Sequence, residues 1–199
     1  MNNSTIPLSR EPLRIQGERL YLRDLQLRDL NAVLKLRGDP LVAAGLGIEP
    51  ASEDESRTWL HRAVRNNALI PRYIFQLGVF SKRKGQFVGW VQLGRATPPF
   101  GEDPRGGAPR GSGWYELRYA MLQEWWGQGL ATEAVRCVTG FAFRRLAADA
   151  LFADILPENL ASGRVLQKVA MEPVRETASG CIRYLLVRDA WQARRGEAV

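Results

Sequence analysis

The amino-acid sequence predicts an α/β protein: a single domain with a mixed, mostly antiparallel sheet of six to seven strands and helices on both faces. Three observations carry this prediction. The 199 residues suffice for one sizeable core. Hydrophobic residues make up 45% and charged residues 25%, the balance of an ordinary globular protein. Strand-like and helix-like patterns follow one another in the order β-α-α-β-β-β-α-β-α-β, which favours a mixed sheet with helices on both faces.

The first elements are one strand and two helices. Residues 19–23 alternate apolar and polar side chains, as a half-buried strand does. Apolar residues recur at helical spacing over 25–37, and the cluster Gly38-Asp39-Pro40 is expected to end that helix. Ser52 and Glu55 have the spacing of a capping box, which predicts the start of a second helix.

A hairpin, a long loop and another strand come next. Residues 73–80 and 87–93 are β-branched and aromatic runs joined by a short polar turn. The segment 95–113 contains four prolines and five glycines, which predicts an irregular excursion that could act as a substrate lid. Strand alternation returns at 114–122.

The second half alternates helix and strand, with helices expected at 130–146 and 160–169 and strands at 151–155 and 182–187. The domain boundaries then follow from the ends of these patterns. We expect a flexible N-terminal tail over 1–12, one domain over 13–190, and a charged C-terminal tail over 191–199.

The net charge of +7, from 28 basic and 21 acidic residues, is the unusual feature of the composition. It suits a phosphate-bearing cofactor, nucleic acid, an acidic membrane surface or simply a solvated basic surface. No stretch approaches the roughly 18 apolar residues of a membrane span, so we expect a soluble, cytoplasmic protein without a membrane partner. His61 is the only histidine, and Cys137 and Cys181 are isolated, so no metal site is expected.

The most informative segment is 122–134, Leu-Gln-Glu-Trp-Trp-Gly-Gln-Gly-Leu-Ala-Thr-Glu-Ala. A strand ends there, Gly127 and Gly129 make a tight turn, and a helix begins. Free N–H groups at a helix N-terminus attract anions, and glycines let a diphosphate approach the main chain. Taken alone, the same glycines also suit a plain strand-to-helix turn.

This segment resembles the acetyl-CoA motif of the GCN5-related N-acetyltransferases (GNAT), particularly the branch of ribosomal-protein N-terminal acetyltransferases. The run Asn159-Leu-Ala-Ser-Gly-Arg-Val-Leu-Gln-Lys168 resembles that branch's Asn-x-x-Ser-x-x-Val/Leu-Leu-x-Lys helix and lies at the expected distance. The order of elements over 19–187 fits as well, so the resemblance covers nearly the whole chain.

The resemblance implies acetyl-CoA as acyl donor and direct attack of an amine on its thioester. Main-chain groups of Met121 and Leu122 would align the pantetheine arm, and Asn159 would bind pantetheine or cap its helix. The pyrophosphate would be held by the main-chain N–H groups of Trp126, Gly127, Gln128, Gly129, Leu130, Ala131 and Thr132.

Two side chains are candidates for catalysis by the same resemblance. Glu116 could accept the proton of the amine, directly or through water, although a strand carboxylate can also be merely exposed or salt-bridged. Ser162 could donate a hydrogen bond to the leaving thiolate. The chain departs from the family pattern at Glu124, where Gln or Arg is usual, and at Ala170-Met171, where Gly-Phe is usual.

The amine acceptor is expected to be a protein N-terminus or a small molecule, and the protein to be a monomer or a homodimer. An alternative donor is aminoacyl-tRNA, because basic residues gather in the hairpin and the long loop. These are Arg72, Lys82, Arg83, Lys84, Arg95, Arg105 and Arg110. A second alternative is a non-catalytic protein that binds acyl-CoA or nucleic acid.

Overall fold

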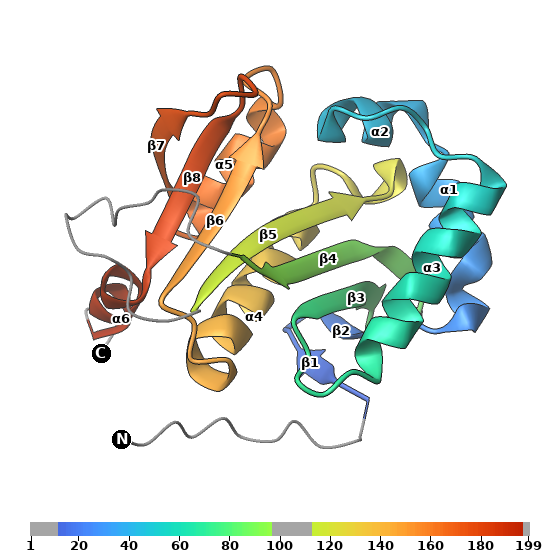
Figure 1. The fold of residues 1–199 in the computed structure, drawn as a ribbon, viewed down its shortest axis with the longest axis horizontal. Coiled ribbons are helices and arrows are strands. Elements are labelled where there is room, and N and C mark those ends of the chain that lie inside the picture. Colours follow the sequence, from blue (N-terminus) through green and yellow to red (C-terminus); the bar gives the residue numbers. More distant parts are fainter. Residues whose placement is uncertain (1–11, 97–112, 197–199) are drawn as a thin grey trace.

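The computed structural model describes residues 12–96 and 113–196. The centre of the fold is an eight-stranded sheet flanked by helices (Figure 1). The strand order is β1-β2-β3-β4-β5-β6-β8-β7, and every pair is antiparallel except β5 with β6. The strands are β1 (Arg14–Gln16), β2 (Leu20–Asp24), β3 (Ile74–Ser81), β4 (Phe87–Arg95), β5 (Trp114–Met121), β6 (Ala150–Ile155), β7 (Glu172–Glu176) and β8 (Ile182–Val187).

The predicted fold class is therefore confirmed, with β1 and β7 added to the expected strands. Both are short strands at the two edges of the sheet, and all five residues of β7 are exposed. A strand exposed on both faces carries no alternation of apolar and polar residues, which is the signal that sequence patterning detects.

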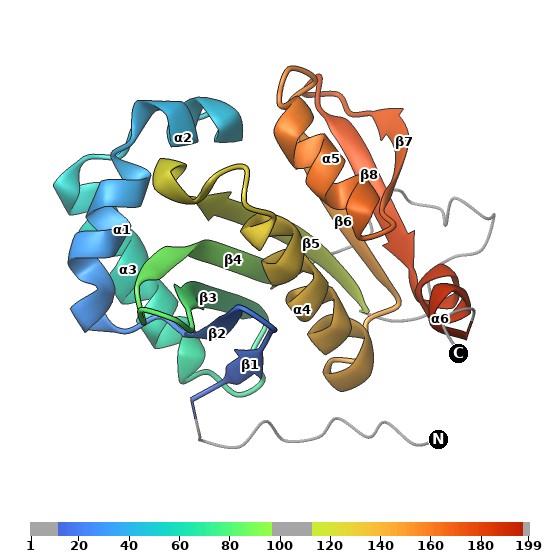
Figure 2. The same cartoon turned by 180° about the vertical axis from the view of Figure 1, so that it is seen from behind.

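Helices cover both faces of the sheet. They are α1 (Leu30–Arg37), α2 (Pro40–Leu46), α3 (Glu53–Asn67), α4 (Leu130–Arg145), α5 (Leu160–Lys168) and α6 (Arg188–Gly196), with short 3-10 turns η1 (Leu27–Asp29) and η2 (Gln123–Trp125). Helices α4 and α5 pack on one face, as seen from behind in Figure 2, and α1 and α3 pack on the other. The larger core lies under α4, where Phe141 meets Phe75 of β3 edge-on at 5.5 Å.

Helix α2 was not expected from the sequence. The cluster Gly38-Asp39-Pro40 does end α1, but it also starts the next helix, because Asp39 caps α2 by accepting from the N–H groups of Leu41 and Val42. Pro40 takes the first helical position, which suits its fixed φ. Gly47 then closes the helix at φ 67°.

The charged residues expected as a C-terminal tail include a helix, because α6 continues to Gly196. Its Trp191 stacks on Phe143 of α4, with ring centroids 5.0 Å apart. Arg188, at the start of the helix, also donates to the carbonyls of Phe143 and Ala148. One aromatic residue among charged ones is too little for a helical pattern in sequence. The predicted lid, with Arg105 and Arg110, lies mostly outside the described residues.

Within 12–96 and 113–196, no helix is long and apolar enough to cross a membrane.

Candidate active site

A gap between β5 and β6 is the main feature of the sheet. The two parallel strands pair only through Trp114, Tyr115 and Glu116, and the last pair joins Glu116 to Phe152. Beyond it, β5 continues along β4 as far as Met121, while β6 continues along β8 as far as Ile155. The strands therefore diverge, and main-chain groups along the open stretch have no neighbouring strand to pair with.

The loop after β5 has the backbone that the sequence indicated. Gly127 and Gly129 have φ of 71° and 74°, a left-handed conformation that side chains disfavour. A Cβ at Gly127 would meet no atom within 4 Å, so the space beside it is open. Their positive φ accounts for glycine at both positions. The open space also lets another group approach the main chain closely at Gly127.

Helix α4 presents free N–H groups at this loop. Gly129 is its N-cap, and the first main-chain bond of the helix runs from Glu133 N to Gly129 O. The N–H groups of Leu130, Ala131 and Thr132 come before that bond, where a helix has no acceptor of its own. Together with the helix dipole they form a site for an anion.

Of the two residues whose main-chain groups were expected to line the gap, Met121 faces it and Leu122 does not. Leu122 donates its N–H to Val88 and accepts from Trp125, so both of its groups are already used. Main-chain groups alternate sides along a strand, so those of Tyr119 and Met121 point into the gap. The indole Nε1 of Trp126 donates to the Met121 carbonyl at 2.7 Å, which leaves the Met121 N–H and both groups of Tyr119.

The negative charge of Glu124, the acidic residue beside the loop, is paired with a lysine. Its carboxylate lies 2.6 Å from Nζ of Lys35, and this hydrogen bond holds the pKa of Glu124 below its usual value. Neighbouring Gln123 turns toward α2 and donates to the Asp39 carboxylate. Sequence reasoning missed Lys35, since only the packing of α1 against η2 brings it to the loop.

Asn159 and Ser162 lie at the start of α5, on the other side of the gap. The Asn159 side chain accepts from Ser162 N at 3.0 Å, as an N-cap does, and its Nδ2 donates to the Gly45 carbonyl of α2 at 2.6 Å. Asn159 thus ties α2 to α5. The Tyr119 hydroxyl donates to the Ser162 carbonyl at 3.1 Å, and burial raises the pKa of Tyr119 to about 12.

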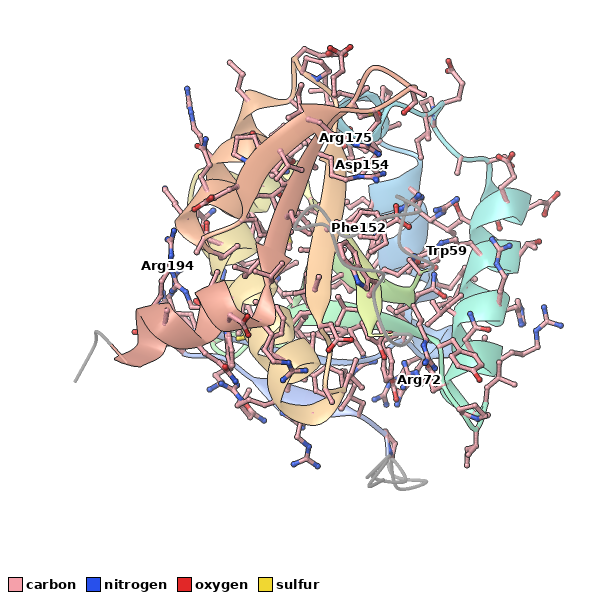
Figure 3. The ribbon with its side chains drawn as sticks, turned by 60° about the vertical axis from the view of Figure 1, so that its left-hand side comes forward. Trp59, Arg72, Phe152, Asp154, Arg175 and Arg194 are labelled. Carbon is pink, nitrogen blue, oxygen red and sulfur yellow. The ribbon has the colours of Figure 1, made fainter. Side chains whose placement is uncertain are left out.

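Glu116 lies at the closed end of the gap, on the sheet face opposite α4. Arg118, two residues along the same face, pairs with its carboxylate at 2.7 Å. Across the gap Asp154 of β6 accepts two bonds from Arg183, with distances of 2.6 and 2.5 Å. Asp154 and Phe152, both of β6, are labelled in Figure 3. The two carboxylates flank the gap. Asp154 was not among the residues expected at the site, because only the pairing of β6 with β8 brings Arg183 to it.

The basic residues of the hairpin do not share one role. Arg72 is 7% exposed in its side chain and pairs with buried Asp24 at 2.7 Å, so it is a structural residue of the domain. Lys82 donates to the Gly17 carbonyl. Arg95 lies over the ring of Tyr73 at 5.3 Å. Arg72 is therefore not part of an exposed basic surface, which binding of tRNA would require.

Metal ligands do not gather in the described part of the chain: no group of three His, Cys, Asp or Glu side chains could hold an ion there. His61 is exposed on α3.

These residues fit a cofactor with a diphosphate and an amide-bearing arm. Open space at Gly127 and the N–H groups of Leu130 to Thr132 suit the diphosphate. The free main-chain groups of Tyr119 and Met121 suit an extended arm that adds to β5 as a strand would. Coenzyme A has both parts.

Comparison with known proteins agrees with this fit. Residues 19–172 match the family model of the acetyltransferase (GNAT) domain. The chain is 27% identical over 191 residues to the FsC-acetyl coenzyme A-N(2)-transacetylase of Aspergillus fumigatus, covering 87% of this chain and 75% of the relative.

Solved structures share the fold at lower identity. The spermidine N-acetyltransferase of Vibrio cholerae, in complex with CoA and spermine, superposes with a TM-score of 0.71 at 15% identity, covering 87% of this chain and 98% of that one. A putative ribosomal-protein-serine acetyltransferase from Vibrio cholerae gives a TM-score of 0.66 at 18% identity, covering 88% and 97%. The chain belongs to the GNAT acetyltransferase family, whose acyl donor is acetyl-CoA.

Proposed function

We propose that this protein transfers an acetyl group from acetyl-CoA to the primary amine of a small molecule, with the acceptor approaching from the sheet face that carries Glu116. The single observation that carries the proposal is the position of the gap. Free main-chain N–H groups lie along it and at its α4 end, and Glu116 lies at its closed end on the opposite face.

Acetyl-CoA, when bound, supplies a thioester whose carbonyl carbon accepts a nucleophile. The chain's own residues do the rest. The N–H groups of Leu130, Ala131 and Thr132 bind the diphosphate, Lys35 cancels the charge of Glu124 beside it, and Tyr119 and Met121 orient the arm.

Two side chains assist the transfer, one as a proton acceptor and one as a hydrogen-bond donor. The Glu116 carboxylate takes a proton from the acceptor amine, directly or through one water, and Arg118 holds that carboxylate in place. Ser162 Oγ donates a hydrogen bond to the departing sulfur. Tyr119 and Asn159 fix Ser162 by binding its carbonyl and its N–H, so the hydroxyl is presented from a rigid first turn of α5.

A small-molecule acceptor is supported by the names of the relatives. One is named for an N(2)-transacetylase reaction and one for spermidine, and a further structural neighbour is an aminoglycoside acetyltransferase. A protein N-terminus is the second candidate, because the chain also resembles a putative ribosomal-protein-serine acetyltransferase in fold.

An acceptor panel tests the proposal. The purified protein is incubated with acetyl-CoA and polyamines, aminoglycosides, amino-acid-derived amines or peptides with free N-termini, and release of free thiol is followed. Turnover with one small-amine class is expected. Turnover with peptides alone would contradict the small-molecule acceptor, and binding of charged tRNA without any response to acetyl-CoA would contradict the donor.

A further inference from the structure

Arg19 ties together three segments that are far apart in sequence. It lies immediately before β2, and its Nη1 donates to the main-chain carbonyl of Gln128 at 2.9 Å. Its Nε donates to Glu133 in the first turn of α4, also at 2.9 Å. The Arg19 side chain is half exposed, at 52%, so it lies at the surface beside the loop.

Glu133 anchors this arrangement from the helix side. Its carboxylate is mostly buried, and it accepts from the main-chain N–H groups of Arg19 at 2.7 Å and Leu20 at 3.2 Å. Burial acts to raise the pKa of Glu133, but these bonds and the Arg19 side chain outweigh it and lower the pKa. The start of β2 is thereby fixed to the start of α4, and Arg19 is held in reach of the loop.

Peptide geometry turns the Arg19 contact into control of an N–H group. In a trans peptide the carbonyl of Gln128 and the N–H of Gly129 point in opposite directions. Because Arg19 holds that carbonyl on the β2 side, the Gly129 N–H points the other way, away from β2. Arg19 Nη2 also lies 3.4 Å from where a Cβ of Gly129 would be, so it closes the loop from that side.

A second hydrogen bond holds the side chain of the same residue, Gln128. The Gln128 side chain donates from Nε2 to the carbonyl of Glu124 at 2.9 Å, which braces the loop against η2. Gly129 itself has φ 74°, and glycine is free to leave that conformation at little cost. A loop with two left-handed glycines needs such external bonds to keep one conformation.

We propose that Arg19 is a positioning residue for the cofactor's diphosphate: through the Gln128 carbonyl, it orients the Gly129 N–H toward the phosphate groups and sets the affinity for CoA. The inference rests on the proposed function. It assigns the role to geometry and not to charge, because the Arg19 charge is already paired with Glu133.

Calorimetric titration with CoA and with 3′-dephospho-CoA tests this on the wild type and on Arg19→Gln, Arg19→Lys and Arg14→Gln. Arg14→Gln is the matched control, since Arg14 is an exposed arginine of the adjoining β1 that stacks on Tyr21. Arg19→Gln is expected to weaken both ligands about tenfold, the effect of misplacing one hydrogen bond to a charged group.

Arg19→Lys is expected to recover less than half of that loss on a logarithmic scale. It keeps the charge but lacks the planar fork that reaches Glu133 and Gln128 together. Arg14→Gln should change affinity less than twofold. Thermal melts of each variant show that the protein titrated is folded.

Two results would overturn the role of Arg19: a folded Arg19→Gln protein whose CoA affinity stays within twofold of the wild type, or equal losses in Arg19→Gln and Arg14→Gln. If lysine restores full affinity, charge and not position is responsible, and the inference is again wrong. A wild type that binds no CoA would instead contradict the proposed function.

Discussion

The hydroxyl of Tyr119 on β5 donates to the main-chain carbonyl of Ser162 on α5 at 3.1 Å, and so links the two sides of the gap. Tyr119→Phe removes this bond and nothing else of comparable size. We expect a loss of about 1 kcal/mol in the free energy of unfolding, the usual contribution of one hydrogen bond. A fall in kcat should accompany it, because Ser162 loses a support. Denaturant unfolding and steady-state kinetics measure the two effects.

The same substitution changes the response to alkaline pH. The pKa of Tyr119 is raised by burial to about 12, so the folded protein favours the neutral phenol. A raised pKa contributes stability that is complete below the unfolded value of about 10 and is lost as pH rises toward 12. Between pH 9 and 11, as an approximate working range, the wild type should lose more stability than Tyr119→Phe. Parallel pH curves for the two proteins would contradict the assignment.

Gly127→Ala separates backbone strain from ligand binding. Gly127 and Gly85 both have positive φ, 71° and 65°, and a Cβ on either meets no atom within 4 Å. Both alanine variants should therefore lose about 1–2 kcal/mol of stability from strain alone. Only Gly127→Ala should also weaken CoA, since Gly85 lies in the β3–β4 turn. Equal CoA affinity in the two variants would remove Gly127 from the binding loop.

Asn159 has two functions that different substitutions can separate. Asn159→Asp keeps an oxygen for the Ser162 N–H but loses the donor to the Gly45 carbonyl of α2. Asn159→Ala loses both. We expect the alanine variant to be less stable by about 1 kcal/mol more than the aspartate variant, the usual contribution of an N-cap. Both should raise the KM of the acceptor if α2 forms part of its site, and an unchanged KM would exclude that.

Ala170 stands where the family pattern usually has glycine. It follows α5 at φ 70°, a position where glycine is usual and where alanine is strained. Ala170→Gly should raise the free energy of unfolding by roughly 0.5–1 kcal/mol, since relief of strain outweighs the greater chain entropy of glycine. The control is Ala44→Gly in the exposed interior of α2, which should lose about 1 kcal/mol. Losses in both variants would contradict the argument.

The fold was largely predictable because most elements are half-buried and carry periodic patterns. The bounds of β8 match the expectation, and those of α4 and β6 differ by one residue. Features without periodicity were missed. The edge strands β1 and β7 bury little, α2 follows α1 after only Gly38 and Asp39, and α6 has a single aromatic residue, Trp191.

Only those features of the candidate site that depend on the local conformation of the backbone could be predicted from the sequence. The glycines of the loop and the cap at Asn159 are local, and both are found as expected. Lys35, Arg19 and Asp154 each contact a residue 29 or more positions away in the chain. Local sequence patterns carry no information about such contacts. The side of β5 that faces the gap depends on its register with β4, which turns the main-chain groups of Tyr119 and Met121 toward the gap and the N–H of Leu122 toward β4.

The central claim is that CoA binds with its diphosphate at the start of α4 and its arm along β5. The most direct test records ¹⁵N-¹H spectra of the protein during titration with CoA, and separately with pantetheine, which lacks the phosphates. CoA should shift the amides of Gly129, Leu130, Ala131 and Thr132 as well as that of Met121, while pantetheine should affect Met121 and leave the helix start unchanged. CoA shifts confined to other parts of the chain would contradict the account.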